Sequence, residues 1–153
     1  MKIFKKKTII YSPANGVIKS IDKVKDEVFS SKALGDGFAL ETTEKSIYSP
    51  VEGEITSIFP TKHAISIKTA TGLEILIHIG IDTVELDGEG FIMKVAEGDK
   101  VSKDTELVTV DFPYLESKGK DTDVLVIFTN LKDSSLSITE GGTFFKQVIG
   151  MAK

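Results

Sequence analysis

Short segments with the alternation of β-strands recur along the whole chain, and they constrain its fold more than any other feature. They include "FALET", "HAISIKT", "LEILIHI", "ELVTVDF", "DVLVIFT" and "FFKQVI". All are rich in β-branched or aromatic residues and are bounded by Gly, Asp, Pro or Thr. Glycine turns such as "ALGDGF" and "LDGEG" separate the segments. Strands with this spacing are typical of sandwiches and barrels.

Long helical periodicity is nearly absent from the chain. The segment "DFPYLESKGK" predicts one short helix, with Pro113 near its start, where a missing N–H costs nothing. The sequence therefore predicts an all-β protein, an antiparallel β-sandwich or barrel-like fold with only short helical turns.

One internal repeat is visible. The pattern Y-S-P-x-x-G-x-I-x-S-I occurs at Tyr11–Ile21 and again at Tyr48–Ile58. A glycine after the proline marks a turn, and alternation begins behind it. We interpret the repeat as architecture, two similar hairpin arms without chemistry of their own. Two copies do not support a solenoid.

Length and composition narrow the class of protein. A chain of 153 residues suits one domain over 1–153, with 1–8 as a short N-terminal tail. The net charge of −4 argues against a nucleic-acid-binding surface, and the absence of cysteine excludes thiolate chemistry and disulfides. No apolar run has the length of a secretory signal or a membrane span. We expect a soluble, cytoplasmic protein.

The two histidines of the chain lie on either side of a predicted hairpin turn. His63 stands in "FPTKHAISIKT" and His78 in "LEILIHIG", and "TATG" separates the two strands. With the turn centred between Ala70 and Thr71, His63 and His78 become direct cross-strand partners whose rings touch. A shift of one residue would place them on opposite faces of the sheet.

Three kinds of chemistry fit such a pair. The histidines could be structural residues at a sheet edge. They could bind a metal, with a carboxylate such as Asp82 completing the ligands. A neutral ring could also attack phosphorus through its free nitrogen and become phosphohistidine, while the neighbouring imidazole binds the phosphoryl oxygens. No nucleophile elbow, phosphate-binding glycine loop or H-E-x-x-H motif occurs.

The segments "PTKHAISI", "ILIHIGIDTVELDGEGF", "LGDGFAL" and "VIFTN" resemble the glucose-type IIA proteins of the bacterial phosphoenolpyruvate-dependent sugar phosphotransferase system. The resemblance extends from about Tyr11 to about Ile149. It implies a β-sandwich that carries a phosphoryl group from the phosphohistidine of HPr to a cysteine on the IIB domain of a sugar permease. It implies no metal and no organic cofactor, and a monomer is sufficient for such a relay.

The resemblance also implies roles for individual residues. His78 matches the phosphorylated histidine, His63 the auxiliary one, Thr61 the hydroxyl residue that supports His63, and Asp82 the active-site aspartate. An apolar partner-binding surface is implied at Phe29, Leu34, Phe59, Leu76 and Val84. Two departures affect partner preference: Glu27 replaces an apolar residue, and Leu76 replaces the aromatic residue of enteric relatives.

One alternative of another class remains, a carrier or binding module similar to biotinyl and lipoyl domains. Glycine turns and short strands in "EGDKVSKDTELVTVD" have the rhythm of such modules. They require an exposed lysine in a tight hairpin, typically beside methionine. The pair Met93-Lys94 is the one candidate after the initiator, and its flanking sequence lacks the usual symmetry.

Overall fold

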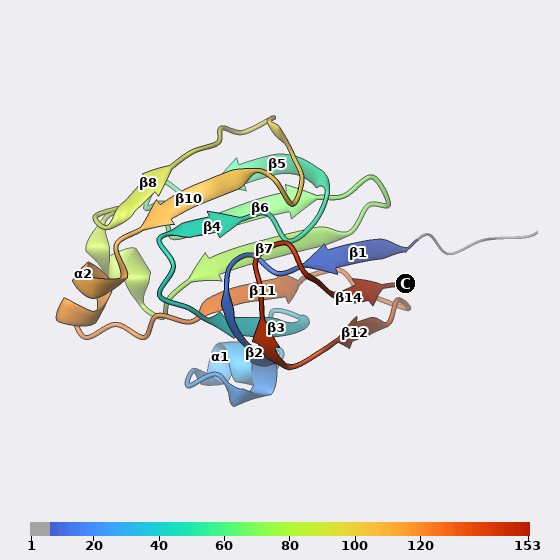
Figure 1. Cartoon of the computed structure of the whole chain (residues 1–153), viewed down its shortest axis with the longest axis horizontal. Coiled ribbons are helices and arrows are strands. Elements are labelled where there is room, and N and C mark those ends of the chain that lie inside the picture. The colour runs from blue at the N-terminus through green and yellow to red at the C-terminus, as the bar shows by residue number, and fades with distance from the viewer. Residues whose placement is uncertain (1–6) are drawn as a thin grey trace, which may run out of the picture.

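The computed structural model describes residues 7–153, which form three antiparallel sheets (Figure 1). The largest has the strand order β13-β2-β3-β11-β7-β6-β5-β9, and two three-stranded sheets have the orders β1-β14-β12 and β4-β10-β8. The all-β prediction is confirmed. Residues 1–6 of the predicted tail over 1–8 lie outside the described residues, and Thr8 already begins the first strand.

The strands are β1 Thr8–Tyr11, β2 Gly16–Ser20, β3 Asp36–Glu41, β4 Ser46–Tyr48, β5 Gly53–Ile58, β6 Ala64–Lys68, β7 Glu74–Ile79, β8 Phe91–Met93, β9 Lys100–Val101, β10 Glu106–Val110, β11 Val124–Phe128, β12 Leu136–Ile138, β13 Gly141–Thr143 and β14 Val148–Ala152. The helices are the 3₁₀ turns η1 Ile21–Lys23 and η2 Thr83–Leu86 and the α-helices α1 Glu27–Ser30 and α2 Phe112–Ser117.

The predicted short helix is α2. Asp111 caps its start, where its side chain accepts a hydrogen bond from the backbone N–H of Tyr114 at 3.1 Å, and Pro113 occupies the first turn. Among residues 7–153, no helix combines the length and apolar character that crossing a membrane requires.

The strands form two halves with the same pairing pattern. Strands β4 to β10, a continuous stretch, pair as β4·β10·β8 in the small sheet and β7·β6·β5·β9 in the large one. Strands β1, β2, β3, β11, β12, β13 and β14 pair in the same way, as β1·β14·β12 and β11·β3·β2·β13. The two halves join where β7 pairs with β11. We call them the continuous half and the split half.

The sequence repeat lies at corresponding places in the two halves. The N–H of Tyr11 donates to the carbonyl of Pro50 at 2.8 Å, and the N–H of Tyr48 donates to the carbonyl of Pro13 at 3.0 Å. Each Y-S-P turn therefore completes the backbone bonding of the other, and β2 and β5 follow as equivalent strands. The interpretation of the repeat as architecture agrees with this arrangement.

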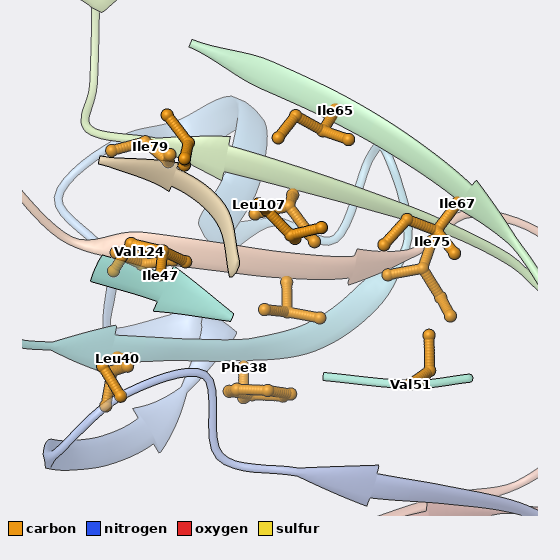
Figure 2. Packing of buried hydrophobic residues seen from close by; sticks show 14 of the residues in the cluster. Phe38, Leu40, Ile47, Val51, Ile65, Ile67, Ile75, Ile79, Leu107 and Val124 are labelled. Atoms are coloured by element: carbon orange, nitrogen blue, oxygen red, sulfur yellow. The ribbon is translucent and has the colours of Figure 1, made fainter. Parts of the chain in front are cut away.

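One face of the large sheet forms the main core against the small sheets. Alternate residues of β6, β7 and β11 point to this side, as expected for strands with one buried face. Figure 2 shows Ile47 of β4 and Leu107 of β10 among the isoleucines of the large sheet. The fully buried residues of this face include Phe38, Leu40, Ile65, Ile67, Ile75, Ile77, Ile79, Val124, Val126 and Phe128.

The opposite face of the large sheet is only partly covered. Residues 21–35, which connect β2 to β3, fold over it and carry η1 and α1 (Figure 1). Their apolar side chains Ile21, Val24 and Phe29 form a second, smaller cluster with sheet residues that include Leu125 and Ile127. The equivalent connection in the continuous half is only residues 59–63, so the sheet beside it stays open.

Candidate functional site

The hairpin of β6 and β7 has a register one residue away from the predicted one. Ala64, not His63, is the cross-strand partner of His78. The loop spans residues 69–73, an odd number of positions, so its centre falls on Thr71 instead of between Ala70 and Thr71. The prediction of direct pairing was therefore wrong, because it assumed an even loop.

The two imidazoles nevertheless meet. His63 lies on the bend that precedes β6, directly after Lys62, whose φ of 61° is in the left-handed region. The side-chain alternation of the strand does not extend to this bend. The carbonyl of His63 accepts the N–H of Ile79 at 2.8 Å, and the ring centroids of His63 and His78 lie 5.0 Å apart with an interplanar angle of 80°.

The ring of His78 is fixed by the backbone that follows it. Its Nδ1 lies 2.8 Å from the carbonyl oxygen of Gly80. Because a carbonyl only accepts hydrogen bonds, Nδ1 carries the proton and Nε2 keeps a lone pair. Gly80 has a φ of 75°, which suits glycine, and this turn directs its carbonyl back toward the ring.

His63 is held by Thr61. The hydroxyl Oγ1 of Thr61 lies 2.8 Å from Nδ1 of His63, and the His63 side chain is buried. The ring of Phe59 approaches His63 edge-on, with centroids 5.7 Å apart. The short connection 59–63 thus places an imidazole, its hydroxyl partner and an aromatic ring together at the open face of the sheet.

Both histidines are neutral at pH 7. Burial and, to a smaller extent, the nearby His63 lower the pKa of His78 to about 4, against weaker opposing effects from the Gly80 carbonyl, Asp26 and Asp82. Burial also lowers the pKa of His63, opposed by the backbone of Thr61. A neutral imidazole with a fixed Nδ1–H is a nucleophile at Nε2.

Two carboxylates act on His78 through charge. Asp82, which the resemblance implies as the active-site aspartate, is exposed at the start of η2 with a φ of 60°, and its charge raises the pKa of His78. Asp26 was missed. It caps α1, where its Oδ1 accepts the N–H groups of Val28 and Phe29 at 3.0 and 3.4 Å. An aspartate before "EVF" is a recognisable N-cap, but sequence alone did not place α1 beside β7.

A search with family models matches residues 8–134 to the EIIA 1 family of the phosphoenolpyruvate-dependent sugar phosphotransferase system. The chain belongs to this EIIA family. The match covers both histidines, Thr61, Asp82 and every strand from β1 to β11. The resemblance noted in the sequence is thereby confirmed.

Relatives of this EIIA chain include separate proteins and parts of longer ones. The glucose-specific EIIA component of Mycoplasma capricolum is 42% identical over 142 residues, 93% of this chain and 92% of the relative. The glucose-specific EIICBA component of Streptococcus pneumoniae is 50% identical over 121 residues, 79% of this chain but only 17% of that protein. The solved glucose permease IIA from Mycoplasma capricolum superposes with a TM-score of 0.90 at 38% identity, covering 99% of both chains.

The apolar residues predicted for the partner surface of the EIIA chain differ in their exposure. Leu34, Phe59 and Val84 are exposed, and Leu76 is half-buried. Phe29 is only 8% exposed, because its ring packs against His78 with centroids 4.9 Å apart. Phe29 therefore forms a wall of the site instead of open surface. Its exposed neighbour is Val28, another residue that the sequence analysis missed.

Two alternatives from the sequence can be compared with the geometry, a metal site at the histidines and a carrier lysine at Lys94. Among residues 7–153, no group of three or more His, Cys, Asp or Glu side chains is arranged to hold a metal ion. The carrier alternative needs Lys94 at a hairpin tip. Its N–H instead donates to the carbonyl of Leu107 at 2.9 Å, so Lys94 extends the pairing of β8 with β10.

Proposed function

We propose that the chain is a phosphohistidine carrier that accepts a phosphoryl group from phospho-HPr on Nε2 of His78 and passes it to a cysteine of the IIB domain of a glucose-type sugar permease. The observation that carries the proposal is the pair of neutral imidazoles 5.0 Å apart, one of them with its Nδ1 tied to a backbone carbonyl. Relatives named as glucose-specific EIIA components support the substrate class.

Acceptance is an in-line displacement at phosphorus. The lone pair of His78 Nε2 forms a new N–P bond while the N–P bond of the donor phosphohistidine breaks, and that electron pair returns to the donor ring. Donation to IIB reverses the roles, because a cysteine sulfur forms an S–P bond as the His78 N–P bond breaks. The loose transition state leaves positioning and charge stabilisation as the protein's contribution.

The second imidazole stabilises the phosphoryl group. The Thr61 hydroxyl can donate to Nδ1 of His63, and in that tautomer Nε2 of His63 carries the proton and donates to a phosphoryl oxygen. Thr61 thereby orients the ring. Asp82, exposed beside the site, would repel the phosphate, so we assign its carboxylate to a cationic group of a partner.

The exposed apolar residues Leu34, Phe59 and Val84, with Val28, form the proposed partner surface. A relay needs this surface to accept two proteins in turn, and exposed apolar groups of this kind mark such contacts. Relatives in which EIIA is joined to IIB and IIC, such as the β-glucoside-specific EIIBCA component of Bacillus subtilis, support IIB as one partner. A cytoplasmic location belongs to the same proposal.

The proposal is tested by intact mass spectrometry after incubation with phosphoenolpyruvate, enzyme I and HPr. One acid-labile phosphate on the unsubstituted chain, mapped to His78 and absent from His78→Gln, is the expected result. Phosphate on another residue, or none, would refute the assignment. A stable acyl adduct on Lys94 after exposure to a cell extract would favour the carrier alternative instead.

A further inference from the structure

Directly after β7, each N–H and each carbonyl of the two peptide groups on either side of Gly80 makes a hydrogen bond. The first is the peptide between Gly80 and Ile81. Its carbonyl accepts from Nδ1 of His78 at 2.8 Å, and its N–H donates to the carbonyl of Asp121 at 3.1 Å. The carbonyl that fixes the His78 tautomer is therefore itself held in direction from the other end of its peptide plane.

The second peptide group lies between Ile79 and Gly80. Its N–H donates to the carbonyl of Asp123 at 2.8 Å, and its carbonyl accepts from the hydroxyl of Thr83 at 2.6 Å. Two side chains bond to these two peptide groups: His78 to the Gly80 carbonyl and Thr83 to the Ile79 carbonyl. Thr83 is fully buried, so its hydroxyl has no contact with solvent.

Thr83 also packs on the glycine. A Cβ built on Gly80 would lie 2.5 Å from Cγ2 of Thr83 and 2.7 Å from the carbonyl oxygen of Asp121. The methyl group thus occupies the space where a side chain on residue 80 would stand, and the Asp121 carbonyl bounds the same space. Lys19 holds the segment that contains Asp121 through an ion pair with Asp123 at 2.8 Å.

We infer that Thr83 is a positioning residue for phosphoryl transfer: its hydroxyl and methyl group hold the Gly80 carbonyl in place, and this carbonyl keeps His78 in the Nδ1–H tautomer. The catalytic consequence rests on the proposed function. A neutral imidazole has two tautomers, and only the one protonated at Nδ1 offers Nε2 to phosphorus. Without the Thr83 bond to the Ile79 carbonyl, the Ile79–Gly80 peptide could rotate and turn the adjacent Gly80 carbonyl away from the ring, and the ring proton would then divide between both nitrogens.

The test compares Thr83→Val, which keeps the branched shape but removes the hydroxyl, with Thr83→Ser, which keeps the hydroxyl. The ring tautomer of His78 is measured from imidazole ¹⁵N chemical shifts in the unphosphorylated chain, and phosphate uptake from phospho-HPr is timed. We expect Thr83→Val to populate the Nε2–H tautomer and to slow uptake about tenfold to a hundredfold, by analogy with the loss of partners that orient metal-ligating histidines. Thr83→Ser should stay within a few-fold of the unsubstituted chain.

Retention of the Nδ1–H tautomer and of the uptake rate in Thr83→Val would overturn the inference, as would an equal defect in Thr83→Ser. Should Thr83→Val fail to fold, Thr83→Ala removes the same hydroxyl without adding bulk and is judged by the same criteria. Absence of uptake by the unsubstituted chain would refute the proposed function alone, because the tautomer measurement needs no phosphate and tests Thr83 by itself.

Discussion

The continuous half and the split half share one pattern of strand pairing but differ in what they present at equivalent positions. In the continuous half Ala64 pairs with His78, and in the split half Gly37 pairs with Ile127 at the corresponding place. In the continuous half the residue before β6 is His63. The residue at the corresponding position of the split half is Asp36, which is the first residue of β3. The two halves therefore share the same strand pairing, and the chemistry of the site depends on a few side chains at the end of one hairpin.

The connections between equivalent strands explain why the site forms only once. The split half uses residues 21–35 to cover the open face, and this connection reaches across the sheet to place Phe29 against the ring of His78. The continuous half uses the short connection 59–63, which leaves room for two imidazoles. One half supplies the reacting groups, and the other supplies the wall and the Asp26 charge beside them.

The largest effect expected from this difference concerns donation of the phosphoryl group. His63→Gln replaces the imidazole held by Thr61 with a flexible amide, so the donor to the phosphoryl oxygens loses its fixed position, and donation to IIB should slow by about a hundredfold to a thousandfold. Acceptance from HPr should partly survive, because Nε2 of His78 is intact. The measurement is single-turnover transfer in each direction.

Asp36→Asn is the matched control at the equivalent position. Its side-chain oxygen can still accept the N–H of Gly37, a bond of 2.8 Å in the structure, so both transfer rates should remain close to normal. Complete loss of acceptance in His63→Gln would contradict this division of roles between the histidines.

A second difference between the halves should appear as a pH dependence of stability. The pKa of His78 falls from 6.5 to about 4 on folding, so the unfolded chain binds a proton first as the pH drops. The stabilisation is fully present above pH 6.5 and is lost as the pH falls toward 4, by about 2 to 3 kcal/mol at pH 4.5. Urea unfolding at pH 7.5 and pH 4.5 measures it.

His78→Gln isolates this contribution from that of other titrating groups. The loss of stability between the two pH values should be smaller in the variant by roughly the amount given above. Equal pH dependence in both proteins would show that His78 keeps an ordinary pKa and that the site is more hydrated than its packing indicates.

The shared strand pairing predicts equal effects in the two halves. Ile18 and Ile55 occupy the same position of the sequence repeat, on β2 and β5, and both are almost fully buried. Ile18→Val and Ile55→Val should each lower the free energy of unfolding by about 0.5–1.5 kcal/mol. Neither should change phosphate uptake. A difference of several kcal/mol between them would show that the halves are not energetically equivalent.

The smallest expected effect is that of Asp26 on His78. Asp26→Asn removes a negative charge but keeps an oxygen that can cap α1. The pKa of His78 should fall by roughly a few tenths of a pH unit, because the charge that favoured the imidazolium is gone. Asp22→Asn, in η1 of the same connection, is the control that should leave the ring unaffected. NMR titration of the His78 ring protons measures both.

Much of the fold was predictable because it depends on local patterns. Alternation identified β6, β7, β10 and β11, and the Asp111–Pro113 signal located the start of α2. The register of the β6–β7 hairpin was not predictable, because "TATG" fits an even or an odd loop and the choice shifts every pair by one residue. The exposure of Phe29 was equally hidden, since it depends on a connection that folds over a distant strand.

By itself, the sequence determined that the chain is all-β, that it belongs with EIIA proteins and that two histidines flank one hairpin, because these properties reside in residue types and their spacing. Only the tertiary structure decided that the rings meet despite the shifted register, that Gly80 and Thr61 fix them, and that α1 brings Asp26 and Phe29 to them. These contacts join segments far apart in the chain, and their geometry depends on packing that no local pattern encodes.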